Sequence, residues 1–318
     1  MLKVTPQLID AISRNANRTA SPAVRILIDE ILERHGEAAK AVLYYGSCLR
    51  SGDDLDGLVD LYLLVDDYRN AYKSRLQASL NVLLPPNVYY LEKKFRGHTV
   101  RTKYAVLSMA DFKKGTSTGW FHSYLWGRFC QPTALLFARS DEVAQQVFEC
   151  FAQAVLTFVR RVLPGISPDF TARQLWGRGF TLSYGAELRS ENPEKRARLF
   201  DAAAMYYEEI TGLALEAHSY PIQVHKSDDL PQYSVHITAR KRRINQLAWK
   251  LRTWQGKLLS ILRLLKATAT FEGGVDYILW KIKRHSGVTI QVEPRLKQHP
   301  LLAMWVLAWR LYRKGGFR

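Results

Sequence analysis

The sequence predicts an α+β fold, and two observations lead to this prediction. Short apolar segments of strand length, rich in β-branched and aromatic residues, fall between residues 41 and 107. After residue 128 the apolar residues recur at helical spacing instead. Strands gathered in one part of a chain and helices in another are typical of α+β proteins. We therefore expect a small sheet with helical additions and no internal repeat.

Two helices are expected ahead of the first strand, at Pro6–Arg14 and Pro22–His35. The second helix has clear signals at both ends. Ser21 is a favoured N-cap residue, and the proline that follows it suits the first helical position. Gly36 is typical of a residue that ends a helix.

Four strands are expected in the sheet, at Ala41–Tyr45, Leu58–Val65, Val88–Phe95 and Val100–Leu107. A helix at Tyr68–Leu83 separates the second strand from the third, and Pro85-Pro86 ends this helix because proline cannot continue it. The run Arg96-Gly97-His98 is interpreted as the turn of a hairpin between the last two strands.

The second half of the chain is expected to be helical, at Ser140–Leu163, Thr171–Ser190 and Glu194–Ala217. A run containing proline and glycine, Pro164–Pro168, separates the first two of these helices. The polar stretch Ser219–Tyr233 is interpreted as a linker, and a long basic helix is expected after it.

Composition and charge narrow the class of protein. Hydrophobic residues make up 47% of the 318 residues, which is enough for proper cores. No segment approaches ~20 uninterrupted apolar residues, and the N-terminal residues lack the apolar core of a secretory signal. The three cysteines lack metal-ligand spacing, which favours a reducing compartment and argues against disulfides or zinc. The net charge of +17 requires an anionic partner, either nucleic acid or an acidic lipid surface.

The stretch from Ala41 to Asp67 carries a recognisable chemistry. A Gly46-Ser47 turn lets backbone N–H groups and a hydroxyl approach a triphosphate, because glycine has no side chain to block it. Asp60, on the next strand, can hold Mg²⁺ against the same phosphates. A buried carboxylate without a cation is costly, so a metal or lysine partner is expected. This order resembles nucleotidyltransferases built like DNA polymerase β, although Tyr62 stands where they usually carry a second carboxylate.

More matches, in the same order along the chain, narrow the resemblance. They are Val65-Asp66-Asp67, Lys103–Val106, Tyr124–Arg128 with Pro132, and Ser183–Arg189. Together they resemble the mitochondrial-type phosphatidate cytidylyltransferases, also called the translocator assembly and maintenance family. Two departures are clear. Gln131 replaces a lysine of the family pattern, and Asp67–Leu80 replaces a segment rich in Asn and His.

The resemblance implies a domain organisation and an activity. The first expected region is a polymerase-β-like nucleotidyltransferase domain (1–138). A helical domain follows (139–238), with a winged-helix-like fold as one alternative. The last is a basic amphipathic membrane-associating region (239–318). The implied activity is CTP:phosphatidate cytidylyltransferase, which forms CDP-diacylglycerol and pyrophosphate with Mg²⁺ as cofactor. A phosphate monoester is largely ionised near neutral pH, so phosphatidate needs no strong general base. This gives a physical reason why Asp60 alone could replace the full set of carboxylates with which a polymerase activates a sugar hydroxyl.

The candidate site residues form two groups. Asp60 and Lys103 are the expected catalytic residues: the carboxylate holds the metal, and the ammonium neutralises charge that develops as pyrophosphate leaves. The residues expected to bind the nucleotide are Gly46, Ser47, Tyr184, Arg128 and Arg189. Guanidinium groups suit bidentate binding of phosphate. As alternatives, Lys103 would be a surface lysine of an edge strand and Tyr184 a core residue.

Other carboxylates near the motif are left with two interpretations. Three aspartates follow the Gly-Ser turn and are expected to be solvated turn residues, one of which could supply a second metal ligand: Asp53, Asp54 and Asp56. Glu92 is expected to be solvated, with a role as base or metal ligand as the alternative. At least one of Asp66 and Asp67 is expected to cap a helix.

The long basic helix, Ala239–Lys266, contains no acidic residue. Its apolar residues share one helix face: Leu247, Leu251, Trp254, Leu258, Ile261 and Leu265. A cationic helix with Trp and Leu on its apolar side suits a membrane interface. The alternative is an ordinary core-packing helix with a solvated basic face.

The C-terminal run Leu301–Trp309 is apolar all round and is followed by cations. With about 18 Å of helix, this segment is too short for a ~30 Å hydrocarbon core. We expect it to enter one leaflet, with Trp305 and Trp309 at the interface and Arg310 and Arg313 on lipid phosphates. The alternative is a terminal helix that docks on the protein's own core or on a dimer partner.

These expectations describe a cytoplasmic protein attached peripherally to the inner face of the cell membrane. Its partners would be CTP, phosphatidate and an anionic membrane surface, with no nucleic acid. Two alternatives stay open. One is a nucleotidyltransferase acting on RNA, in which aromatic residues stack on bases. The other is a non-catalytic relative that binds nucleotide or lipid. The sequence does not predict an oligomeric state.

Overall fold

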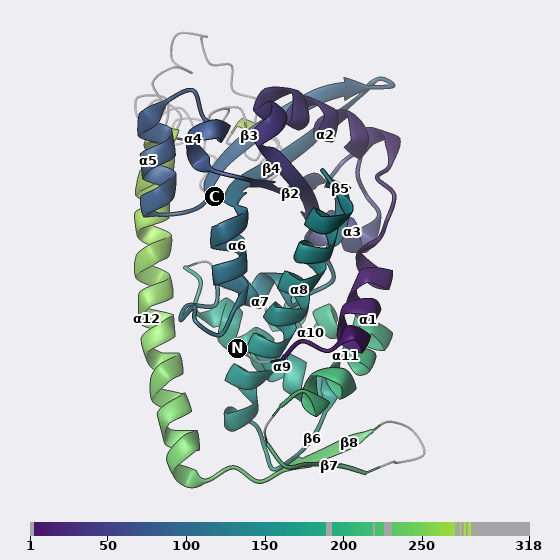
Figure 1. Cartoon of the computed structure of the whole chain (residues 1–318), viewed down its shortest axis with the longest axis vertical. Helices are drawn as coiled ribbons and strands as arrows, with labels where there is room; N and C mark the ends of the chain where they lie inside the picture. Colours follow the sequence, from purple (N-terminus) through teal and green to yellow (C-terminus); the bar gives the residue numbers. More distant parts are fainter. Residues whose placement is uncertain are drawn as a thin grey trace, which may run out of the picture.

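The computed structural model describes residues 3–188, 193–218, 220–225 and 231–270, together with positions 274, 277, 279 and 280. It confirms an α+β architecture with a mixed five-stranded sheet (Figure 1). Among these residues, no helix is both long and apolar enough to cross a bilayer.

The main sheet has the strand order β3-β4-β2-β1-β5. Its strands are β1 (Ala39–Tyr45), β2 (Leu58–Val65), β3 (Asn87–Phe95), β4 (His98–Ser108) and β5 (Ala134–Ala138). Strands β2 and β4 are parallel, and the other pairs are antiparallel. The four expected strands are confirmed, and the expected hairpin turn holds Arg96 and Gly97 at positive φ. Strand β5 was not predicted, because five residues at a sheet edge give little periodicity.

Helix α2 (Pro22–His35) covers one face of this sheet. Its expected ends are confirmed: the Ser21 hydroxyl accepts a hydrogen bond from the Val24 N–H, and Gly36 ends the helix at a φ of 52°. The helix buries Leu27 and Ile31 against sheet residues that alternate along each strand. This period-two burial fixes which side chains of β2 and β4 face the opposite side.

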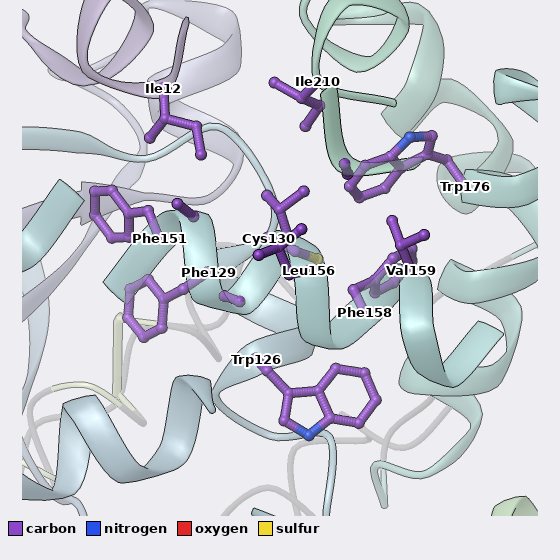
Figure 2. Close-up of a cluster of buried hydrophobic side chains, with 14 of the residues drawn as sticks. Ile12, Trp126, Phe129, Cys130, Phe151, Leu156, Phe158, Val159, Trp176 and Ile210 are labelled. Atoms are coloured by element: carbon purple, nitrogen blue, oxygen red, sulfur yellow. The ribbon is translucent and has the colours of Figure 1, made fainter. Parts of the chain in front are cut away.

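The opposite face of the sheet packs against a larger, helical layer. Its helices are α1 (Pro6–Ala16), α6 (Met109–Thr116), α7 (Trp126–Phe129) and α8 (Asp141–Val162). Figure 2 shows the aromatic centre of this cluster, in which Phe158 stacks on Trp176 with ring centroids 4.6 Å apart. Each such fully buried side chain contributes about 1.5–3 kcal/mol. The same cluster also contains Tyr62 of β2, so the layer fixes the floor on which the site rests.

A second, three-stranded sheet and three helices follow α8. They are β6 (Asp169–Thr171), α9 (Ala172–Gly185), α10 (Pro193–Asp201), α11 (Ala204–Glu216), β7 (Ile222–His225) and β8 (Gln232–Val235). The prediction of a linker over Ser219–Tyr233 is wrong where this stretch is described, because β7 pairs there with β8. These strands are short and mostly exposed, so their polar composition looked like that of a loop. The expected boundaries at residues 138 and 238 stay a prediction.

Two expected helices are each divided in two. The segment predicted as one helix over Tyr68–Leu83 forms α4 (Tyr68–Ala71) and α5 (Arg75–Leu83), and Ser74 caps the second part. Asp67 caps α4 through the Arg69 N–H, which confirms a capping role for this pair of aspartates. The segment predicted over Glu194–Ala217 breaks at Ala203, whose φ of −152° is extended. No proline or glycine marks either break.

The remaining elements are short turns and one long helix. The short ones are η1 (Gly36–Ala38), α3 (Ser47–Ser51) and η2 (Leu163–Gly165). Helix α12 (Ala239–Thr270) runs along the edge of the molecule in Figure 1, with α5 beside its last turns. Its expected apolar face is exposed: the six residues named for it are each between 41% and 67% accessible. The alternative that this apolar face packs on the core is therefore wrong, although five cations of the helix are exposed, as that alternative expected.

Candidate functional site

A polar pocket of about 240 Å³ lies where β1, β2 and β4 meet α7 and α9. It is lined by Tyr45, Gly46, Ser47, Arg50, Asp60, Lys103, Ser123, Gly127, Arg128, Gln131, Pro132, Ser183, Tyr184 and Glu187. Six of the seven residues expected in the nucleotide site thus line one pocket, and the seventh is Arg189. They come from sequence positions 138 residues apart, from Gly46 to Tyr184 (184 − 46).

Asp60 and Lys103 face each other across two parallel strands. They are register partners in β2 and β4, so both side chains leave the sheet on the same face. The ammonium lies 3.2 Å from Asp60 Oδ1. Burial favours loss of the lysine's proton, but the nearby carboxylate outweighs it and raises the pKa of Lys103. The lysine therefore keeps its charge inside the pocket.

Gly46 is required by the geometry of the turn beside Asp60. Its φ is 91°, a conformation that favours glycine. A Cβ at this position would lie 2.9 Å from Asp60 Oδ2, so any larger residue would displace the carboxylate. Ser47 follows directly as the first residue of α3, and Arg50 lies one turn later in the same short helix. The turn thus sets a hydroxyl, a guanidinium and a carboxylate around one space.

Arg128 is held among aromatic rings on the other wall of the pocket. Its Nη1 donates to the Tyr62 hydroxyl at 2.9 Å, and its Nη2 lies 3.4 Å from Glu187 Oε1. The guanidinium carbon also lies 4.5 Å from the centre of the Tyr124 ring and 5.3 Å from that of Tyr45. Such contacts hold a planar cation in a fixed orientation.

Tyr62, in the position of a second carboxylate, is part of this arrangement. Its ring is fully buried, and its hydroxyl donates to the Tyr124 hydroxyl at 3.2 Å while it accepts from Arg128. The residue therefore anchors a cation where a carboxylate would bind a metal. This gives the departure from the usual motif a structural role.

Tyr184 lies on α9 at the edge of the pocket. Its hydroxyl donates to Gln131 Oε1 at 3.3 Å, and the Gln131 amide donates to the Gly127 carbonyl at 2.9 Å. Burial raises the pKa of Tyr184. Gln131, which replaces a lysine of the family pattern, thus orients a tyrosine and brings no charge.

Three aspartates of the loop and Glu92 lie outside the pocket lining. Asp54 accepts hydrogen bonds from the Tyr44 hydroxyl at 2.5 Å and the Ser21 hydroxyl at 2.8 Å. Its interpretation as a solvated turn residue is therefore wrong. Asp53 accepts from the Asp56 N–H, which is ordinary turn geometry. Glu92 is exposed and accepts from the Tyr90 hydroxyl, so its solvated interpretation is confirmed.

Sequence reasoning missed two charged residues of the pocket, Arg50 and Glu187. Arg50 lay in a stretch expected to be a loop, where an arginine carries no signal. Glu187 belongs to the Ser183–Arg189 motif, and its position three residues after Tyr184 is the signal that was available. Arg189 itself lies outside the described residues, as do Trp305, Trp309, Arg310 and Arg313.

The pocket suits a magnesium ion that is shared with a bound anion. Asp60 Oδ1 is buried, and its contact is the ion pair with the Lys103 ammonium. Within the described part of the chain, no group of three His, Cys, Asp or Glu side chains could hold a metal by itself. Magnesium is commonly held by one or two carboxylates plus substrate phosphates, so Asp60 and a polyphosphate together form a suitable donor set.

No protein-family model matches this chain, and no curated protein matches it significantly in sequence. The site must therefore be interpreted from its own geometry. Three cations, Arg50, Lys103 and Arg128, surround the pocket with two carboxylates, Asp60 and Glu187. The excess of positive charge, together with a glycine turn and the Asp60 carboxylate, favours a polyphosphate ligand with a divalent cation.

Proposed function

We propose that the chain is a nucleotidyltransferase with a polymerase-β-like sheet, and that it transfers the cytidylyl group of CTP to phosphatidate. The observation that carries this proposal is the meeting of Asp60, Lys103 and the Gly46-Ser47 turn in one pocket. The order of these residues along the chain and their common face in the sheet both support it. The base and the lipid follow from the family resemblance of the sequence motifs.

The triphosphate would lie between the Gly46-Ser47 turn and the two cations Lys103 and Arg128. Glycine leaves the backbone open to phosphate oxygens, and the Ser47 hydroxyl donates to them. Lys103 would release part of its contact with Asp60 to a phosphate. When bound at Asp60, Mg²⁺ would supply further neutralisation of the phosphate charge.

The acceptor would be the phosphate monoester of phosphatidate. One of its oxygens attacks the α-phosphorus of CTP, and the bond from that phosphorus to the bridging oxygen breaks as pyrophosphate leaves. No proton has to be removed, because the monoester is already ionised. Lys103 stabilises the charge on the leaving group, and in-line positioning by the two walls of the pocket supplies most of the remaining effect.

The exposed face of α12 supports attachment to a lipid surface. Leu251 and Trp254 are 60% and 67% accessible, and contiguous apolar surface of this kind marks an interaction site. Helix α5 extends it with Leu76, Val82 and Leu83, all exposed. Neither α12 nor α5 contains an acidic residue, so the surface would suit an anionic bilayer. An RNA acceptor would require no such apolar face.

The test uses purified protein with CTP labelled at the α-phosphate, Mg²⁺ and phosphatidate in detergent micelles. Label should move into the organic phase in proportion to protein. Phosphatidylglycerol, a phosphodiester without the monoester oxygens, is the matched control acceptor and should take up no label. Label found in an added RNA oligonucleotide would support the RNA alternative, and absence of any transfer would support a non-catalytic binding protein.

A further inference from the structure

Three cations of helix α12 contact the body of the protein. Arg252 is only 1% exposed and donates from Nε to the Phe121 carbonyl at 2.8 Å. Lys266 donates to the carbonyls of Leu84 and Pro86 at 2.5 and 2.8 Å. Arg263 donates from Nε to the Pro85 carbonyl at 2.9 Å. These three cations thus lie on the face of α12 that contacts the rest of the chain, whereas others, such as Lys257, are exposed.

Arg263 also reaches the wall of the nucleotide pocket. Its guanidinium carbon lies 4.1 Å from the centre of the Tyr124 ring. The guanidinium carbon of Arg128, a pocket residue, lies 4.5 Å from the same ring centre. One aromatic ring therefore contacts two cations, one from α12 and one from the site.

A second contact brings α12 to the same wall. Gly256 approaches the backbone so closely that a Cβ there would lie 2.3 Å from the Ala186 carbonyl oxygen. The next residue is Glu187, which pairs with Arg128 Nη2. Helix α12 therefore borders both partners that hold the Arg128 guanidinium, the Tyr124 ring and the Glu187 carboxylate.

We propose that Arg263 is a positioning residue of the nucleotide site, which fixes the Tyr124 ring against Arg128. Two guanidinium groups repel each other, but an aromatic ring with negative π-density attracts both. Arg263 is itself fixed by the Pro85 carbonyl, so it presents an immobile cation to the ring. Without it, Tyr124 keeps only its contacts on the pocket side, and Arg128 loses the support that orients it toward a phosphate.

The kinetic test compares Arg263→Met with Lys266→Met. Both variants remove one cation from the same end of α12, and both residues donate to carbonyls of the segment Leu84–Pro86. Only Arg263 stacks on Tyr124. We expect kcat to fall about tenfold in Arg263→Met, with the KM for lipid unchanged. A fall of about tenfold is the size expected from the loss of one desolvated cation–π contact. Lys266→Met should keep kcat within about twofold, and Arg263→Lys should recover part of the loss.

A spectroscopic test does not depend on turnover. Burial alone would raise the pKa of Tyr124, but Arg128 and Arg263 outweigh it, so that this pKa lies below its ordinary value. Arg263→Met should therefore shift one tyrosine to higher pH in an ultraviolet absorbance titration of the folded protein. The shift should vanish when the two chains compared both carry Tyr124→Phe. A titration unchanged by Arg263→Met, or a kcat equal in Arg263→Met and Lys266→Met, would overturn the proposal.

The kinetic readout rests on the proposed nucleotidyl transfer, whereas the titration does not. A wild-type protein without transferase activity whose Tyr124 titration still responds to Arg263 would refute the function and support the contact. Active protein in which neither readout responds would support the function and refute the positioning role. Thermal denaturation of each variant serves as the control for folding. If Arg263→Met does not fold, Arg263→Lys carries the same comparison with a smaller expected shift.

Discussion

The polar pocket and helix α12 both contain cations that point inward, but the partners of those cations differ. In the pocket, Lys103 contacts a carboxylate, and Arg128 contacts a carboxylate, a hydroxyl and aromatic rings around an open space. On α12, Arg252 and Lys266 donate to backbone carbonyls that have no other role in the site. The first arrangement leaves capacity for an anion, whereas the second uses the cations for docking.

The difference teaches that a basic sequence does not locate an anion site by itself. Helix α12 has basic residues along most of its length, yet four of its cations, Arg242, Arg252, Arg263 and Lys266, are bound to carbonyl groups outside the helix. Its outward side carries exposed apolar side chains together with five exposed cations, Arg240, Lys241, Arg243, Lys250 and Lys257. The local partner decides whether a cation is available to a phosphate.

The largest effect is expected at the one carboxylate that the sheet supplies to the pocket. Asp60→Asn keeps the size of the side chain but removes the charge that would hold Mg²⁺, so turnover should fall at least about a hundredfold. Asp56→Asn, in the loop outside the pocket lining, is the matched control and should stay active. Rates are measured with labelled CTP. Residual activity above about a tenth, only ~1.4 kcal/mol of barrier, would contradict the metal assignment.

The comparison of cations is tested by one arginine from each region. Arg128→Gln should lower kcat about a hundredfold, because it removes a preorganised donor from the phosphate site. Arg242 of α12 donates to the carbonyls of Ile166 and Ile237. Arg242→Gln should instead lower the free energy of unfolding by about 1.5–3 kcal/mol and leave kcat within about twofold. Equal kinetic losses in the two variants would abolish the distinction between site and docking cations.

The exposed face of α12 is tested by a triple variant with Leu247→Gln, Leu251→Gln and Trp254→Gln. Fully buried apolar side chains contribute about 1.5–3 kcal/mol each, so partial insertion of three should be worth at least tenfold in affinity for a bilayer. Sedimentation with liposomes that contain phosphatidate measures this affinity. Met205→Gln is the control, since Met205 is 88% exposed on α11, away from α12. Binding that survives the triple variant would exclude this face as the contact.

The smallest effect concerns pH. Burial, and then the neighbouring Arg263, lowers the pKa of Lys266 from 10.5 to about 7. The unfolded chain therefore binds more protons between these two values, so the free energy of unfolding should rise as pH increases from about 7 toward 10.5. Lys266→Met removes this contribution and should flatten the rise, as measured by denaturant unfolding across the window. Lys257→Met, at an exposed position of α12, should leave the slope unchanged.

Local signals explain the part of the fold that the sequence predicts. The four predicted strands are apolar runs of strand length, and Ser21, Gly36 and Asp67 form the caps expected of them. Elements without such signals were missed. Strand β5 and the β7–β8 pair are short and are defined by distant partners, and the breaks at Ala203 and before Ser74 lack helix-breaking residues.

The residues of the site also divide into those that local signals identify and those that only the folded chain brings together. Gly46, Ser47 and Asp60 are recognisable because their chemistry lies within one short stretch, and Lys103 is recognisable only by resemblance. The parallel register that sets Lys103 beside Asp60 depends on strand order, which no local pattern specifies. Arg50 and Glu187 join the pocket through chain packing alone. Likewise, the spacing along α12 identifies an apolar face, but not which way that face points.

The tyrosine at position 62 limits how this pocket can change. Its hydroxyl binds both Arg128 and Tyr124, so three side chains would lose their arrangement if it were replaced. An aspartate introduced there would be too short to reach the position of the hydroxyl, so Arg128 and Tyr124 would both lose this partner. A single substitution would therefore add a second carboxylate but would also release Arg128 from the hydroxyl that orients it. Under the proposed function, the pocket would favour acceptors that arrive already ionised, because Tyr62 stands where a second carboxylate would help to activate a neutral hydroxyl.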